Sequence, residues 1–258
     1  MPFPCGNAED IVNIAKLCSR IILESGGETY RAEETALRIC KAYGFEETDV
    51  FATPTGVFIS VSTFGNNIVT AIKRIHKRSA DLAAIDAVND VARRLTAGTI
   101  SHTDALAALR AICARKPPRR LYTIAAAGLT SGLMAMLFKG DIFDFLAAAI
   151  CGVLVETVAG LIKSVDAYNF SISILGGFII GLGAVLFVRL TGAGHLDKII
   201  TGAIMPLLPG IQMTSAIRDT MNGDLLSGVS RGAEALLVAV ALAFGVGVML
   251  KLYLQFIA

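Results

Sequence analysis

Five long apolar stretches fill the second half of this sequence and limit what it can fold into. They are residues 121–138, 142–162, 172–190, 199–217 and 232–254. A helix rises about 1.5 Å per residue, so about 20 apolar residues cross a hydrocarbon layer about 30 Å thick. We therefore predict about five transmembrane helices within residues 119–258, with a lipid bilayer as their surroundings.

The first 118 residues have a different character, because most charged residues of the chain lie there. Helical and strand periodicities predict the order α-α-β-β-β-α-α. The helices are expected at about 9–23, 28–43, 80–95 and 102–114, and the strands at 50–53, 57–62 and 68–74. Ser25 with Glu28, and Ser101 with Asp104, are predicted helix caps. The expected fold class is an α-helical polytopic membrane protein with an N-terminal α+β domain, residues 1–118.

The basic residues at the junction predict the orientation. Arg115, Lys116, Arg119 and Arg120 stand directly before the first apolar stretch. Lys and Arg close to membrane spans favour the cytoplasmic side. We therefore expect the N-terminal domain in the cytoplasm, and the protein in the inner (plasma) membrane.

Glu156 is an ionisable residue inside the second apolar stretch. It shares a helix face with Ala148, Gly152 and Gly160, so it is predicted to point into protein and not into lipid. A carboxylate inside a bilayer costs about 2.5 kcal/mol or more, and such residues mark solute or proton paths. The alternatives are a structural hydrogen bond across a helix pair, or a position close enough to the membrane interface to reach water.

The fourth apolar stretch contains Pro206, Pro209 and Gly210. Proline removes a backbone donor and clashes with the preceding turn, so a break or kink is predicted. Transporters use broken helices to build substrate sites, and Gln212 and Thr214 follow as polar candidates. A passive kink that only shapes packing is the alternative.

Charged residues follow this stretch: Arg218, Asp219, Asp224, Arg231 and Glu234. One interpretation is a solvated cytoplasmic loop with an Asn-Gly turn. The other is a gate at the cytoplasmic mouth of a transport path.

Two glycine pairs, Gly128/Gly132 and Gly177/Gly181, match the small-xxx-small pattern that lets helices approach closely in lipid. They indicate packing within the chain or against a partner subunit.

Several function classes lack support. The formal net charge of +2 and the absence of a basic stripe argue against nucleic acid. No P-loop, GxSxG, HExxH or dinucleotide motif occurs, and the cysteines lack metal-ligand spacing, so no enzyme, cofactor or metal is expected. The histidines, including His195, are interpreted as surface or packing residues.

Three motifs resemble the bacterial threonine/serine exporter family: GGETYRAEET at Gly26–Thr35, FATPTG at Phe51–Gly56 and PLLPG at Pro206–Gly210. The resemblance extends over nearly the whole chain, with the motifs in the family's order. It singles out residues of the N-terminal domain: Glu28, Thr29, Tyr30, Arg31, Thr53, Pro54 and Thr55. From the residues alone, Glu28 is a helix cap, and the threonines are strand or turn residues.

The resemblance also implies a partner and a substrate class. Family members are fused chains with two five-span halves, or split pairs in which a longer subunit joins a short five-span subunit. This chain is similar to the longer subunit, which implies a hetero- or homo-oligomer. An odd span number then gives oppositely inserted halves, an inverted repeat. Expected substrates are threonine and serine, or a C4-dicarboxylate such as succinate.

The resulting hypothesis is a subunit of a secondary exporter with its central site at Glu156, Pro206, Pro209, Gly210, Gln212 and Thr214. Two rivals stay open. One is a membrane-anchored hydrolase that uses hydroxyl residues near Thr53–Ser62, and the other is an anchored scaffold or sensor.

Overall fold

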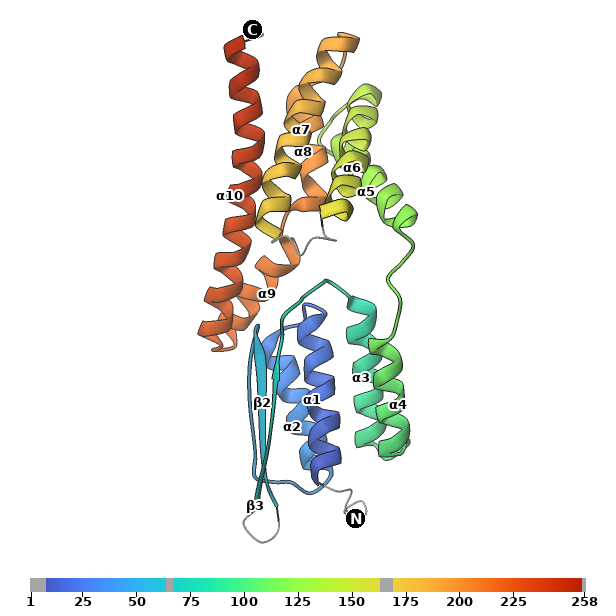
Figure 1. Cartoon of the computed structure of the whole chain (residues 1–258), viewed down its shortest axis with the longest axis vertical. Coiled ribbons are helices and arrows are strands. Elements are labelled where there is room, and N and C mark those ends of the chain that lie inside the picture. Colours follow the sequence, from blue (N-terminus) through green and yellow to red (C-terminus); the bar gives the residue numbers. More distant parts are fainter. Residues whose placement is uncertain (1–7, 64–66, 163–168, 257–258) are drawn as a thin grey trace. The chain divides into compact units, whose positions relative to one another are not determined.

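The computed structural model describes residues 8–63, 67–162 and 169–256, and the chain divides into two compact units (Figure 1). Unit 1 comprises Met1–Lys116 and Ile211–Ala233, and unit 2 comprises Pro117–Gly210 and Glu234–Ala258. The membership of residues 211–233 in unit 1 was not predicted. Residues 64–66 of a predicted turn and Lys163 lie outside the described residues.

Unit 1 has the predicted order of helices and strands. Its helices are α1 (Ala8–Glu24), α2 (Thr29–Ala42), α3 (Leu82–Thr96) and α4 (His102–Cys113), followed by α9 (Gly210–Met221) and the start of α10 (Leu225–Phe256). Its strands are β1 (Thr48–Thr53), β2 (Gly56–Thr63) and β3 (Asn67–Arg74). The local apolar periodicity therefore predicted α1 to α4 and the three strands to within a few residues, but not α9 or the start of α10.

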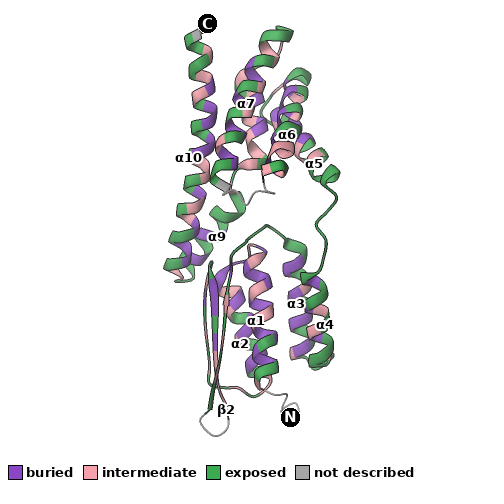
Figure 2. Cartoon of the chain, in the orientation of Figure 1, coloured by how far each residue is buried: buried purple, intermediate pink, exposed green. Residues whose placement is uncertain are grey.

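The sheet is antiparallel in the order β1-β2-β3, and α1 and α2 cover one of its faces (Figure 1). Val57, Ile59 and Val61 alternate along β2 and are fully buried on the covered face. Phe58 points to the opposite face and is exposed. Because successive strand residues point to opposite faces, this alternation sets the register of the sheet. The buried residues of α1, α2 and α3 complete the core of the unit (Figure 2).

The two predicted helix caps have different outcomes. Ser101 caps α4 as predicted, because its hydroxyl accepts a hydrogen bond from the amide of Asp104 at 3.1 Å. The Ser25–Glu28 capping box is wrong. Glu28 is the N-cap residue of α2, but its side chain makes no capping bond and is used elsewhere.

Unit 2 is built from the apolar helices. They are α5 (Arg120–Leu137), α6 (Ile142–Ile162), α7 (Asn169–Thr191) and α8 (Leu196–Ile204), followed by the short turn η2 (Met205–Leu207) and the rest of α10. Among the described residues, four helices are long and apolar enough to span a membrane, or up to five if α8–η2 and α9 form one bent span. This agrees with a polytopic helical membrane protein.

The glycine pairs lie at helix contacts within the chain. A Cβ atom on Gly128 would lie 2.7 Å from Val153 of α6, and one on Gly181 would lie 2.8 Å from Met249 of α10. Gly132 and Gly177 likewise lie close to the backbones of α6 and α10, so a Cβ atom at either position would clash with backbone atoms. The interpretation as packing within the chain is confirmed for both pairs.

Candidate functional site

The predicted helix break is present at the end of α8. Helix α8 ends at Ile204, the turn η2 contains Pro206, and a separate helix, α9, begins at Gly210. The proline ring explains the break, because it cannot continue the backbone hydrogen-bond ladder. Neither helical piece reaches about 20 residues, so neither crosses a bilayer alone.

Glu156 lies on α6 and is half-buried. On the same face, Gly152 packs against Ala127 and Ser131 of α5. This face therefore points into protein, as predicted. Among the described residues, Glu156 forms no hydrogen bond or ion pair. The alternative of a Glu held by a hydrogen bond across a helix pair has no support in this part of the chain.

Gly176 of α7 connects the Glu156 region with the helix break. A Cβ atom on Gly176 would lie 3.1 Å from Leu207 of η2 and 3.4 Å from Val155 of α6. Val155 precedes Glu156, and Leu207 lies between the two prolines. The carboxylate-bearing turn of α6 and the broken helix therefore approach the same glycine.

The polar candidates after the break belong to unit 1. Gln212 is exposed, and the hydroxyl of Thr214 donates a hydrogen bond to the backbone carbonyl of Ile211 at 3.0 Å. Their predicted role as substrate ligands beside Glu156 stays a prediction.

A second site forms inside unit 1, where α9 meets the start of α2. The carboxylate of Asp219 accepts hydrogen bonds from the amide of Thr29 at 3.1 Å and from its hydroxyl at 3.2 Å. Thr29 is the first residue of α2. Helix N-termini carry unpaired amides and partial positive charge, which favour an anion. Asp219 thus supplies the cap that Ser25 was predicted to supply.

Arg231, from the first turns of α10, forms a buried ion pair with Asp219. Its Nε lies 3.1 Å from Asp219 Oδ2, and its other nitrogens donate to the carbonyls of Gly27 at 2.7 Å and Gly26 at 3.4 Å. The side chains are 4% and 0% exposed for Arg231 and Asp219. Breaking a pair this deeply buried is costly, because one charge is then left in a low-dielectric interior.

The turn at Gly26 and Gly27 explains how their two carbonyls reach Arg231. Gly26 has a φ of +80°, in the left-handed region that favours glycine. A Cβ atom on Gly27 would lie 2.6 Å from Ile22 Cγ2, so no side chain fits. The two glycines let the chain turn tightly between α1 and α2 and present both carbonyls to one guanidinium.

Glu28 is buried next to this pair, and its carboxylate contacts two arginines that are more exposed. Arg218 Nη1 lies 2.7 Å from its Oε1, and Arg31 Nε lies 3.3 Å from its Oε2. Burial alone would raise the pKa of Glu28, but its own backbone amide, Arg218 and Arg31 outweigh burial and lower it. We call Glu28, Thr29, Arg218, Asp219 and Arg231 the buried ion cluster.

The solvated-loop interpretation of residues 218–234 is wrong for Asp219 and Arg231, because both are buried in unit 1. Asp224 is half-buried, and burial first and then the charge of Asp219 raise its pKa. Glu234 falls in unit 2 and is not part of the cluster. A helical repeat could not have indicated the pairing, because Thr29 and Asp219 lie 190 positions apart.

The other motif residues of unit 1 shape the hairpin and its contact with α2. Glu33 Oε1 accepts a hydrogen bond from the amide of Ala52 at 2.7 Å, which joins the first motif to the second. Thr53 and Thr55 share a hydrogen bond of 3.1 Å at the hairpin turn, where Pro54 is buried. Tyr30 accepts a hydrogen bond from Arg31 at 3.3 Å.

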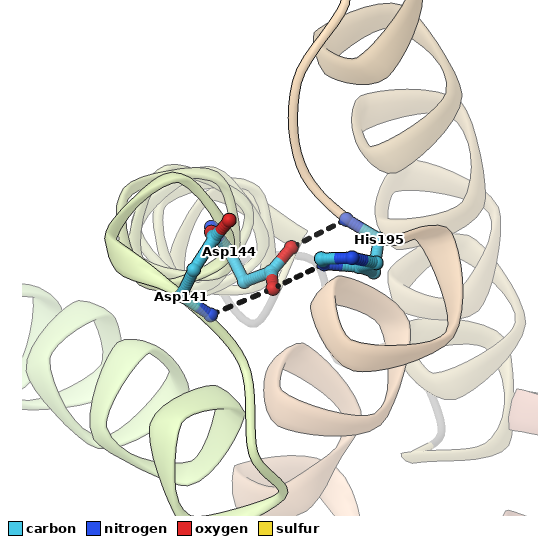
Figure 3. A group of neighbouring side chains, drawn as sticks. All are labelled: Asp141, Asp144 and His195. Carbon is cyan, nitrogen blue, oxygen red and sulfur yellow. Dashed lines mark hydrogen bonds and ion pairs between the residues drawn. The ribbon is translucent and has the colours of Figure 1, made fainter.

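A third group of polar residues lies in unit 2 at the start of α6 (Figure 3). The buried carboxylate of Asp144 accepts hydrogen bonds from the amides of Asp141 at 2.9 Å and His195 at 2.6 Å. Its Oδ2 also lies 3.0 Å from His195 Nδ1. Ligand atoms of the three residues lie within 4.8 Å of one another, as a metal ion would require. Because N–H groups already use both Asp144 oxygens, the group ties the α7–α8 loop to α6. The interpretation of His195 as a surface or packing residue agrees with its exposed side chain, but it did not include this contact with Asp144.

The His195–Asp144 pair predicts a pH-dependent stability. The hydrogen bond to Asp144, and then its charge, raise the pKa of His195 above 6.5. A raised histidine pKa gives stability that is complete below pH 6.5 and is lost as pH rises through the folded value. The melting temperature should therefore differ most between the protein and its His195→Phe variant in mild acid, and least in mild alkali. His76→Phe, at an exposed histidine, is the control. A difference independent of pH would contradict the assignment.

Comparison with known proteins finds a family profile and a relative that match most of this chain. The sequence profile of the threonine/serine exporter family (ThrE) matches residues 13–253. The chain is also 24% identical over 244 residues to a protein of Mycobacterium tuberculosis (strain ATCC 25618 / H37Rv) named "Probable threonine/serine exporter". That match covers 93% of this chain and 46% of the relative, so the chain spans about half of the relative's length. No solved structure matches the chain. With the profile matching nearly all of its residues, the chain belongs to the threonine/serine exporter family of membrane exporters.

Proposed function

We propose that the chain is a subunit of a secondary exporter for small carboxylate-bearing metabolites, either threonine and serine or a C4-dicarboxylate such as succinate. The observation that carries the proposal is the broken helix α8–η2–α9, whose turn approaches Gly176 together with the turn that bears Glu156. Broken helices in membranes free backbone groups that bind substrates and coupling ions.

The two substrate classes need different partners at this site. The ammonium of an amino acid suits the carboxylate of Glu156, which has no ion-pair partner among the described residues. A substrate carboxylate suits the amides at the start of a half-helix. A dicarboxylate would use the second kind of contact alone, and Glu156 would then carry a coupling proton.

The exporter needs a second half in this proposal. The relative is about twice as long as this chain, which supports pairing with a short five-span subunit of the same family or with a second copy. The basic residues Arg115, Lys116, Arg119 and Arg120 favour unit 1 on the cytoplasmic side of the inner membrane.

The buried ion cluster gives unit 1 a role in gating. It attaches α9 and the start of α10 to the Gly26–Gly27 turn and to α2 through three contacts: Asp219 with Thr29, Arg218 with Glu28, and Arg231 with the carbonyl of Gly27. Helix α10 continues into unit 2. A rearrangement of unit 1 would therefore act on both helices that flank residues 222–224.

The hydrolase alternative has less support from the geometry. The hydroxyls of Thr53 and Thr55 bond to each other, and Ser60 bonds to Thr70 at 3.1 Å. A nucleophile needs a base within hydrogen-bond reach. None of these bonds, within the described hairpin residues, involves a histidine or a carboxylate.

Reconstitution tests the proposal. The chain is placed in proteoliposomes alone and together with a short five-span subunit of the family, and exchange of labelled threonine, serine and succinate is followed. We expect exchange of at least one substrate, and greater exchange with the second subunit. Folded preparations that exchange none of the three substrates would contradict the proposal.

A further inference from the structure

Unit 1 contains a cleft whose lining includes no residue of the buried ion cluster. The cleft has a volume of about 590 Å³ and lies between α1, α4 and the end of β3. This volume falls within the range of about 300–1,000 Å³ that is usual for small-molecule sites. All of its lining residues belong to unit 1.

Basic side chains from three elements converge on this cleft. Lys16 and Arg20 come from α1, Lys73 from β3, and His102 and Arg110 from α4. Asp10 is the acidic residue of the lining. Four permanent cations thus face one carboxylate, although the whole chain has a formal net charge of only +2.

The two helices and the strand place these charges along the lining of one cleft. Lys16 and Arg20 are four residues apart on α1, and His102 and Arg110 share a face of α4. Like charges at this spacing on a helix repel each other. Lys73 is half-buried and lies on the opposite face of β3 from exposed Ile72. An apolar residue would be usual at such a position. Such an arrangement is favourable when an anion offsets the charges.

The contacts among the described residues neutralise only part of this charge. Arg20 pairs with Glu24 at 2.8 Å, and Lys16 donates to the neutral amide oxygen of Asn13 at 2.7 Å. Among the described residues, the side chains of Lys73 and Arg110 form no ion pair or hydrogen bond. They remain available to bind a ligand.

The cleft also has an apolar part. Ile14, Leu17 and Leu106 line it beside the charged groups, and Ile14 is 1% exposed. Apolar walls reduce the local dielectric and strengthen the attraction between a cation and an anion. They also suit the non-ionic part of a metabolite.

We propose that this cleft binds a phosphorylated metabolite with two or more negative charges. Guanidinium groups bind phosphate oxygens in pairs, and lysines add point charges. Arg110 and Lys73 are the principal ligands, and Lys16 and Arg20 complete the positive end. This site lies within the N-terminal residues and is independent of the proposed transport path.

Binding of pyrophosphate to the full chain in neutral-lipid nanodiscs tests the proposal without measuring transport. We expect saturable binding that the double substitution Lys73→Ser, Arg110→Ser weakens about tenfold or more, which is the effect of losing about 1.4 kcal/mol. The matched control, Arg38→Ser with Lys41→Ser, removes the same charge from exposed positions of α2. Equal weakening by both double substitutions, or no saturable binding by the unmodified chain, would overturn the proposal.

A labelling measurement on the unmodified chain does not depend on whether the substituted variants fold. Pyrophosphate should protect Lys73 from amine acylation, as read by mass spectrometry, and leave Lys41 unprotected. Equal labelling of Lys73 with and without pyrophosphate would overturn the proposal. Nanodiscs with phosphatidylglycerol distinguish a lipid headgroup from a soluble metabolite. Retained pyrophosphate binding supports the soluble ligand, and abolished binding contradicts it.

Discussion

Replacing Asp219 by Ala should lower the stability of unit 1 by about 3–5 kcal/mol, the cost of breaking a buried ion pair. The substitution leaves Arg231, whose side chain is 4% exposed, without this carboxylate. It also removes the acceptor for the amide and hydroxyl of Thr29. The effect should appear as faster hydrogen exchange at the start of α2 and as easier proteolysis within residues 211–233.

Two further variants separate this effect from a general loss of charge. Asp90→Ala removes an exposed carboxylate that lies 3.7 Å from Arg93 and Arg94, and surface pairs contribute only about 0–1 kcal/mol. The paired substitution Asp219→Leu, Arg231→Met should cost less than Asp219→Ala, because neither charge is left buried alone. If Asp219→Ala is no more harmful than Asp90→Ala, the buried ion cluster does not hold α9 in place.

Replacing Glu156 by Gln should reduce transport about tenfold or more. The amide keeps the size of the side chain but removes its charge, and a hydrogen bond to a charged group contributes about 1.5–3 kcal/mol. The measurement is substrate exchange in proteoliposomes that contain equal amounts of folded protein. Glu46→Gln, at an exposed position outside the helices, is the matched control.

The substrate pattern of this variant identifies what Glu156 does. A loss confined to threonine and serine would indicate that the carboxylate binds an ammonium group. A loss for succinate as well would indicate a coupling proton, since a dicarboxylate has no ammonium to bind. Unchanged exchange of every transported substrate would remove Glu156 from the mechanism and leave the broken helix as the remaining candidate.

Much of the fold could be predicted because its signals are local. The alternation of Val57, Ile59 and Val61 with exposed residues predicts a strand with one covered face, and the structure confirms it. The apolar run of residues 142–162 has the same bounds as α6. Pro206 and Pro209 predict the break because proline acts on its own backbone and on the preceding turn.

The composition of the candidate sites depended on contacts between distant residues. Asp219 caps α2 across 190 positions, and Asp144 holds His195 across 51. In neither case does a helix or strand period relate the two residues. The capping-box prediction failed for this reason, since α2 begins only at Thr29 and the acceptor for its first amide is Asp219 of α9.

The sequence by itself determined that this chain has an N-terminal α+β part and apolar helices of membrane-spanning length, because hydrophobic period and run length are properties of neighbouring residues. Only the tertiary structure decided that residues 211–233 join the N-terminal unit and that five basic side chains line one cleft. Those features arise from packing of elements far apart in the chain, where the partner of a buried charge is set by geometry and not by spacing.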